Sequence, residues 1–195
     1  MKIYHKLPDI NPCFVKKNKY FFLFETSLPS KENIYSYIFA DPVKVIKVHD
    51  FSAVNRAFEE IEQYSKKYFI AGYFSYELGY FFEKDLFKTK TRFKNPLIHL
   101  CAFGKPVIFN HKTGRIKGKF KGLFSKQKKD RSFSVENLKL NIKQSDYIKK
   151  INRIKEYIRR GDTYQVNFTC KYHFNFKGNP FLLYHELKSR QKVPY

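Results

Sequence analysis

Seven successive even-numbered positions near the end of the chain are apolar or aromatic, while the odd-numbered positions from 163 to 177 are all polar. The apolar members are Tyr164, Val166, Phe168, Cys170, Tyr172, Phe174 and Phe176. Such strict alternation is typical of a β-strand with one buried face. The pattern predicts a long strand over residues 163–177. A strand of this kind needs a covering layer, and nothing after it supplies a partner strand, so we expect these residues to begin a larger domain.

Shorter runs of β-branched and aromatic residues predict further strands in the first 120 residues. These runs are YFFLFET (20–26), YSYIFA (35–40), VKVIKV (43–48), LIHLCAF (97–103) and KPVIF (105–109). HKTG (111–114) predicts a hairpin turn into RIKGKF (115–120).

Three segments have helical spacing instead. The first helix is predicted over residues 52–66, with Ser52 as its N-cap. The second begins at Ser145 and ends before Gly161, a residue suited to the left-handed conformation that closes a helix. The third is opened by Asn179 and Pro180.

These elements predict an α+β fold with strand-rich antiparallel sheets and external helices. Residues 1–125 form a strand-rich N-terminal region, and 145–195 are the start of a second domain. The segment 121–144 is polar, rich in lysine and without sustained periodicity, so we expect a linker over 126–144.

Charge is the unusual feature of the composition. The chain has 39 Lys and Arg against 17 Asp and Glu, a net charge of +22. Such an excess attracts anions of every kind and selects none of them. The lysines are spread along the chain, with a single dense run at 117–131, so a dedicated nucleic-acid binder is not favoured. That run is either a solvated loop or a patch for phosphate or an acidic partner.

Cysteine use and hydropathy indicate a soluble cytoplasmic protein. Cys13, Cys101 and Cys170 are far apart and form no CxxC pair, which favours reduced thiols. No signal peptide or membrane span is evident. Metal ligation by the six histidines is not favoured either, because none are closely paired, and we expect surface or locally hydrogen-bonded roles for them.

Three stretches nevertheless resemble one family. GDTYQVN, within residues 148–174, resembles the helix-to-strand turn that begins the chorismate-binding domain of aminodeoxychorismate synthase component I and anthranilate synthase component I. GYFSYELGYFFE (72–83) and FLFETSLPSKENIYSYIFADP (22–42) are similar to two stretches of the N-terminal region of the same proteins, in the same order. Members of this family build a two-sheet sandwich with helices outside it. By this resemblance, Gln165 and Asn167 on the polar side of the long strand face the interior of the domain.

The resemblance implies a reaction. Ammonia from a glutamine amidotransferase subunit replaces the hydroxyl of chorismate, assisted by a magnesium ion that screens the carboxylates of the substrate. The product is 4-amino-4-deoxychorismate, a precursor of para-aminobenzoate and folate, in one branch. In anthranilate synthases another position is aminated and pyruvate is eliminated. Glu77, Leu78 and Gly79 after Tyr76 are closer to the aminodeoxychorismate branch.

The catalytic motifs of the family are not found in these 195 residues. Neither the "Pro, Ile, Lys/Ala, Gly, Thr" motif nor the magnesium-binding glutamates occur, so no catalytic or metal-binding residue is assigned, and we expect the chain alone to be inactive. The resemblance does carry over a tryptophan pocket. Its matching positions here are Thr26, Tyr35, Ser36, Tyr37, Ile38, Pro194 and Tyr195. One alternative is that these residues have ordinary roles in strands. Another is that the chain is a non-catalytic remnant, or a module that binds an acidic partner or nucleic acid.

Overall fold

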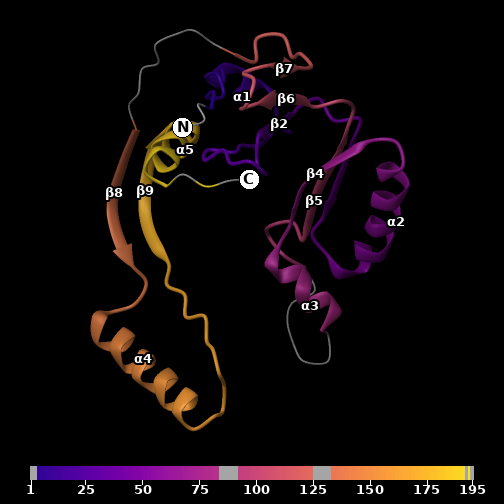
Figure 1. The fold of residues 1–195 in the computed structure, drawn as a ribbon. Helices are drawn as coiled ribbons and strands as arrows, with labels where there is room; N and C mark the ends of the chain where they lie inside the picture. Colours follow the sequence, from indigo (N-terminus) through magenta and orange to yellow (C-terminus); the bar gives the residue numbers. More distant parts are fainter. Residues whose placement is uncertain (1–3, 84–91, 125–132, 192, 194–195) are drawn as a thin grey trace. The chain divides into compact units, whose positions relative to one another are not determined.

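The computed structural model describes residues 4–83, 92–124, 133–191 and 193 (Figure 1). The chain divides into two compact units, Met1–Gln127 with Gln191–Tyr195 and Lys128–Arg190. All strand pairs among the described residues are antiparallel. The predicted mixture of helices and antiparallel sheets is therefore confirmed.

The first sheet of the N-terminal unit follows the predicted strands closely. It contains β1 (Phe22–Phe24), β2 (Tyr35–Phe39), β6 (Val107–Asn110) and β7 (Ile116–Lys117), in the order β1-β2-β6-β7. The predicted hairpin turn is present between β6 and β7. Gly114 has φ +69 there, the left-handed conformation that glycine adopts most readily.

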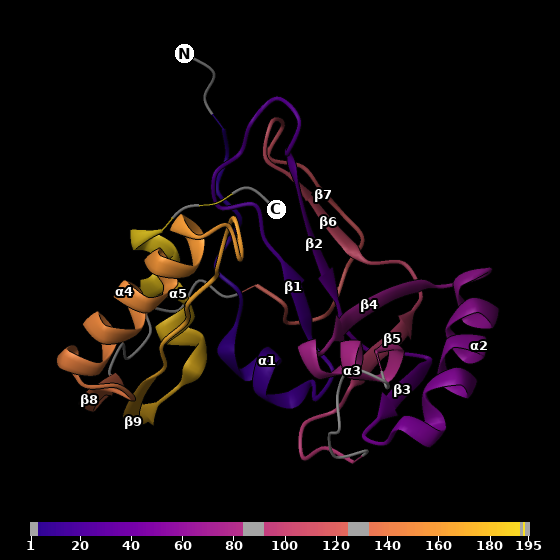
Figure 2. The same cartoon turned by 90° about the horizontal axis from the view of Figure 1, so that it is seen from below.

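The second sheet contains β3 (Lys44–Val48), β5 (Ile98–Phe103) and β4 (Phe69–Phe74), in the order β3-β5-β4. Helix α2 (Val54–Ser65) packs on one face of this sheet (Figure 2), where its buried Val54 and Ala57 join the strand residues Ile46 and Leu100 in one core. The opposite face meets the first sheet. Phe103 there contacts the rings of Phe22 and Phe39, with centroids 5.9 and 5.3 Å away.

Consecutive strands β2 and β3 belong to different sheets. Asp41, between them, has φ 54, a left-handed conformation that Asp tolerates better than most residues. This turn redirects the chain from one sheet to the other. The separation of two adjacent strands into two layers was not predicted from their similar sequence patterns.

The helix termini differ in detail from the prediction. A 3₁₀ turn, η1 (Phe51–Ala53), precedes α2, and the carboxylate of Asp50 accepts a hydrogen bond from the backbone N–H of Ser52. The predicted Ser52 cap was therefore wrong, because Ser52 lies inside the 3₁₀ turn, whose N-cap is Asp50. The unit also contains α1 (Pro12–Lys17), η2 (Tyr76–Leu78) and α3 (Gly79–Phe82).

The second unit contains β8 (Phe133–Leu140), α4 (Gln144–Arg159), β9 (Tyr172–Gly178) and α5 (Pro180–Arg190). Strands β8 and β9 pair with each other, and α4 lies in the connection between them (Figure 1). Gly161 has φ +79 after α4, and the Asn179 side chain accepts from the N–H of Phe181 at the start of α5, so both predicted helix boundaries are confirmed.

Two expectations for this unit were wrong. Residues 133–140 of the expected linker form β8. The pairing register shifts between Glu136 and Lys139, around Asn137 with φ 56, which moves the apolar positions from odd to even numbers and hides the alternation. The long strand is shorter than predicted, since 163–171 lie outside any strand. Its partner precedes it in the chain.

The apolar side of β9 is largely exposed. Tyr172 is 61% exposed and Phe174 44%. None of the described residues of the second unit is buried. The covering layer that the alternation calls for is therefore not supplied by the described residues of this unit.

Candidate functional site

Three of the tryptophan-pocket residues lie on one side of β2 and are buried there. Thr26, Ser36 and Ile38 are at most 1% exposed. The backbone N–H of Thr26 donates to Ser36 Oγ over 3.0 Å, and the Thr26 hydroxyl donates to the carbonyl of Tyr35 over 2.8 Å. The two hydroxyls are thus held in a polar cluster inside the N-terminal unit.

His111 completes this cluster. Its Nε2 lies 2.7 Å from Ser36 Oγ, and its Nδ1 lies 2.8 Å from the carbonyl oxygen of His5. A carbonyl only accepts, so Nδ1 carries the proton, and in the neutral ring Nε2 accepts from the Ser36 hydroxyl. The edge of the ring also meets Phe109, with centroids 4.8 Å apart.

A buried role for His111 was not predicted. The sequence interpretation placed it on the surface or in a local hydrogen bond, which was wrong. It is 2% exposed, and its side-chain partners are the hydroxyl of Ser36 and the carbonyl of His5, both far away in sequence. The stretch HKTG, which begins with His111, is typical of a turn and does not indicate that the histidine is buried. Because Ser36 is fully buried, a substrate cannot reach this serine and histidine pair, and the pair stabilises the fold rather than acting as a nucleophile.

Tyr35 and Tyr37 lie on the opposite side of β2 from Ser36 and Ile38, because side chains alternate along a strand. Both tyrosines line an open groove over β2, β6 and β7. The five candidates from β1 to β2 therefore do not converge on one cavity. The sheet separates the two tyrosines from the buried cluster.

The remaining two candidates, Pro194 and Tyr195, lie outside the described residues. Val193, directly before them, is held beside Thr26. The carbonyl of Val193 accepts from the backbone N–H groups of Ser27 and Leu28, each at 3.0 Å. Ser27 Oγ also donates to this carbonyl and accepts from the N–H of Val193 at 2.8 Å. The sequence did not predict this contact, because Ser27 and Val193 are 166 positions apart.

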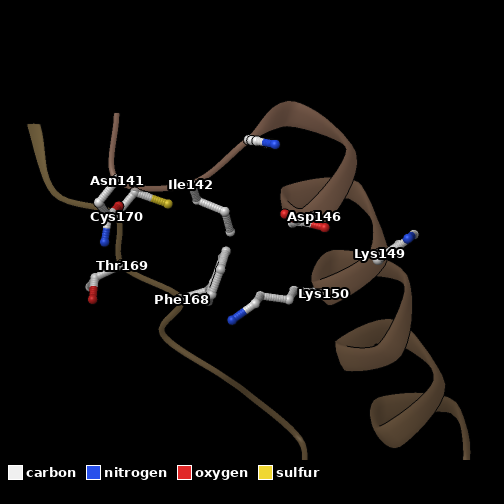
Figure 3. A pocket seen from close by; sticks show the side chains of 9 residues that line it. Asn141, Ile142, Asp146, Lys149, Lys150, Phe168, Thr169 and Cys170 are labelled. Atoms are coloured by element: carbon white, nitrogen blue, oxygen red, sulfur yellow. The ribbon is translucent and has the colours of Figure 1, made fainter. Parts of the chain in front are cut away.

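A second cavity of about 590 Å³ lies in the C-terminal unit, between the start of α4 and the segment before β9. Phe168, Thr169 and Cys170 at the end of the family-like motif form one wall (Figure 3). Lys150 extends from α4 toward Phe168, its Nζ 6.0 Å from the ring centroid, while Lys149 points away. The positive charges of the lysines at this cavity attract anions, whereas the negative charge of Asp146 repels anions.

The motif GDTYQVN itself is solvent-facing. Gln165 and Asn167 are exposed, and Tyr164 is 92% exposed. The guanidinium of Arg160 forms an ion pair with Asp162, which holds the turn after α4. The interior position that the resemblance implies for Gln165 and Asn167 is not observed in this unit, because no layer of described residues covers its sheet.

Two ionisable groups, the buried Cys101 and the half-buried His99, lie on β5, where the sheets face each other. Burial raises the pKa of the Cys101 thiol to about 11. Burial also lowers the pKa of His99, and the positive charges of Lys47 and His49 lower it further. His99 is surrounded by the rings of Tyr20, Phe22 and Tyr73. Its Nε2 has no hydrogen-bond partner among the described residues.

Metal ligands do not gather in the part of the chain that the structure describes. No three His, Cys, Asp or Glu side chains there lie close enough together to hold a metal ion. These residues do not fit a magnesium site, so no chemical step is assigned to magnesium on them. Among the described helices, none has the length and apolar character that crossing a bilayer requires.

Comparison with known proteins supplies the functional context. A family model described as chorismate binding enzyme matches residues 20–195. No curated protein and no solved structure matches the chain. The match spans both compact units and includes all three family-like stretches.

Proposed function

Because this chain belongs to the chorismate-binding enzyme family, we propose that it is part of an aminodeoxychorismate synthase component I, which converts chorismate to 4-amino-4-deoxychorismate for para-aminobenzoate and folate synthesis. The family match carries the proposal, since it supports an enzyme that uses chorismate. Glu77, Leu78 and Gly79 after Tyr76 support the aminodeoxychorismate branch.

The proposed reaction replaces one substituent. Ammonia forms a new C–N bond to the chorismate ring, and the hydroxyl leaves as water. We propose that a glutamine amidotransferase subunit delivers the ammonia. The residues that would bind magnesium and activate the hydroxyl belong to family motifs that do not occur in these 195 residues. The chain then contributes scaffold and binding surfaces, and we expect no turnover from it alone.

The product of the native protein tests this proposal. The native protein that contains this sequence is captured with an antibody to the N-terminal unit and incubated with chorismate, ammonium and magnesium. A lyase that converts aminodeoxychorismate to para-aminobenzoate is added to one half of each sample. We expect para-aminobenzoate only in the half with the lyase. The isolated 195-residue chain serves as the matched sample and should form neither product.

Anthranilate synthase is the second outcome of that experiment. Fluorescent anthranilate, formed without the lyase, would replace the proposed product by that of tryptophan synthesis. Absence of both products from the native protein would contradict a synthase function. Steady product formation by the isolated chain would contradict the proposed division of roles.

The contact between Ser27 and Val193 favours a second proposal, that L-tryptophan binds next to this contact. Four hydrogen bonds join the segment directly before Pro194 to the end of the first strand region. In the sequence, Thr26 directly precedes one of these segments, and the candidates Pro194 and Tyr195 directly follow the other. Calorimetry of the chain with L-tryptophan should show saturable heat that Ser27→Ala reduces, because this change removes two of the four hydrogen bonds that hold Val193. Absence of heat would exclude the pocket in this chain.

A further inference from the structure

We propose that the open groove over β2, β6 and β7 binds a planar ring that carries a negatively charged group. The groove has a volume of about 470 Å³, within the range of about 300–1,000 Å³ typical of small-molecule sites. Its lining includes two tyrosines, Tyr35 and Tyr37, and two cations, Arg115 and Lys117. This site is separate from the buried Thr26 cluster on the other side of the sheet, and it does not rest on the proposed synthase function.

Strand register brings the parts of the groove together. Tyr37 pairs with Ile108 across β2 and β6, and Ile108 pairs with Lys117 across β6 and β7. Residues directly opposite each other in antiparallel strands present their side chains on the same face. An aromatic ring, an apolar side chain and a cation therefore lie in one row across three strands. Tyr35, two residues before Tyr37, extends this row on the same face.

The two tyrosines form a platform. Their ring centroids lie 6.3 Å apart with the planes inclined at 48°. A third ring inserted between two parallel rings would need about 7 Å, twice the usual contact distance of about 3.5 Å. A planar ligand therefore lies across the pair rather than between its members. Tyr35 is 40% exposed, so its ring is accessible from solvent.

The cations define the charge of the ligand. Arg115 and Lys117 are exposed, and neither forms an ion pair with a carboxylate of the described residues. None of the described residues that line the groove is acidic. A guanidinium binds a carboxylate or phosphate in a two-pronged arrangement. Lysine on an edge strand also discourages aggregation, but that role does not require two aromatic rings beside it.

Nucleoside monophosphates and aromatic carboxylates both have a ring that can stack and one anionic group. Four probes separate the contributions in calorimetry with the full chain. Adenosine monophosphate and benzoate carry both features, adenosine has the ring alone, and inorganic phosphate has the charge alone. We expect at least one of the first two to bind about tenfold or more tightly than both of the last two. Preference for adenosine monophosphate identifies a nucleotide as the natural source, and preference for benzoate an aromatic acid.

Matched variants locate the binding. R115Q/K117Q should weaken binding of the preferred probe by about tenfold or more, and Tyr35→Leu should weaken it by several-fold through loss of stacking. R56Q/K66Q removes the same charge from exposed positions of α2 and its C-cap, and should change the affinity less than about twofold. Circular dichroism checks that each variant is folded.

Three results would overturn the proposal. The first is that neither adenosine monophosphate nor benzoate binds. The second is that inorganic phosphate binds as tightly as adenosine monophosphate. The third is that R56Q/K66Q weakens binding as much as R115Q/K117Q does. The last two outcomes would show that the net charge of the chain attracts anions without a defined site. The product assay on the native protein is independent of all three.

Discussion

Ser36 Oγ lies 2.7 Å from Nε2 of His111, although 75 positions separate the two residues in the sequence. The hydrogen bond links β2 to the residue that follows β6, and the backbone N–H of His111 donates to the carbonyl of Ile34 beside it. Both side chains are buried, so water cannot replace either partner. This cluster therefore stabilises the centre of the first sheet.

Ser36→Ala should lower the free energy of unfolding by about 1–3 kcal/mol, because His111 Nε2 and the N–H of Thr26 lose a buried partner. Urea unfolding followed by circular dichroism measures the change. Ser65→Ala, at an exposed position at the end of α2, should change the stability by less than about 0.5 kcal/mol. Equal effects of the two variants would show that the buried cluster contributes nothing.

Gly72→Ala should be among the most destabilising single changes in the N-terminal unit. Gly72 has φ +147, and a Cβ there would overlap the carbonyl oxygen of His99 in the adjacent strand. We expect a loss of more than about 2 kcal/mol in the same unfolding measurement. Gly104→Ala is the control, since a Cβ at that position meets nothing within 4 Å and its φ is not positive. An unchanged unfolding midpoint for Gly72→Ala would contradict the close approach of β4 and β5.

Cys13 and Cys101 should differ in reactivity because they differ in exposure. Cys13 is exposed, and Cys101 is buried with its pKa raised to about 11. At about pH 8 the Cys101 thiolate is roughly a thousandth of the population, and the thiolate is the form that iodoacetamide attacks. Peptide mass spectrometry should find Cys13 alkylated and Cys101 unmodified in the native chain, with both alkylated in urea. Rapid labelling of native Cys101 would show that the sheet interface opens.

His99 should make stability depend on pH. Its folded-state pKa lies below the ordinary value of 6.5, chiefly because burial disfavours the charged ring. The unfolded chain therefore binds more protons than the folded chain as the pH falls below 6.5, and the folded state loses stability there. When the pH is lowered from about 7.5 to about 5.5, the Tm of His99→Phe should rise relative to the Tm of the wild type. A difference that stays constant with pH would contradict this role.

Elements with simple local patterns were predicted well. The strands at 22–24, 35–39 and 44–48 coincide with dense β-branched and aromatic runs, and α2 and α4 coincide with helical spacing. Strand β8 was missed because the irregularity at Asn137 moves the apolar positions from odd to even numbers, so neither half of the strand is long enough to show a clear alternation. The tryptophan-pocket residues were named together because they are neighbours in sequence, whereas strand alternation places Tyr35 and Tyr37 opposite Ser36 and Ile38.

By itself the sequence determined the types of most elements, the boundaries of α4 and the resemblance to chorismate-binding enzymes, because these depend on short-range periodicity and on contiguous motifs. Only the tertiary structure decided that β2 and β3 enter different sheets, that Ser36 meets His111, and that Arg115 and Lys117 lie beside two tyrosine rings. Each of these relationships joins residues through strand pairing or a change of chain direction, and the order of residues along the chain does not encode such contacts locally.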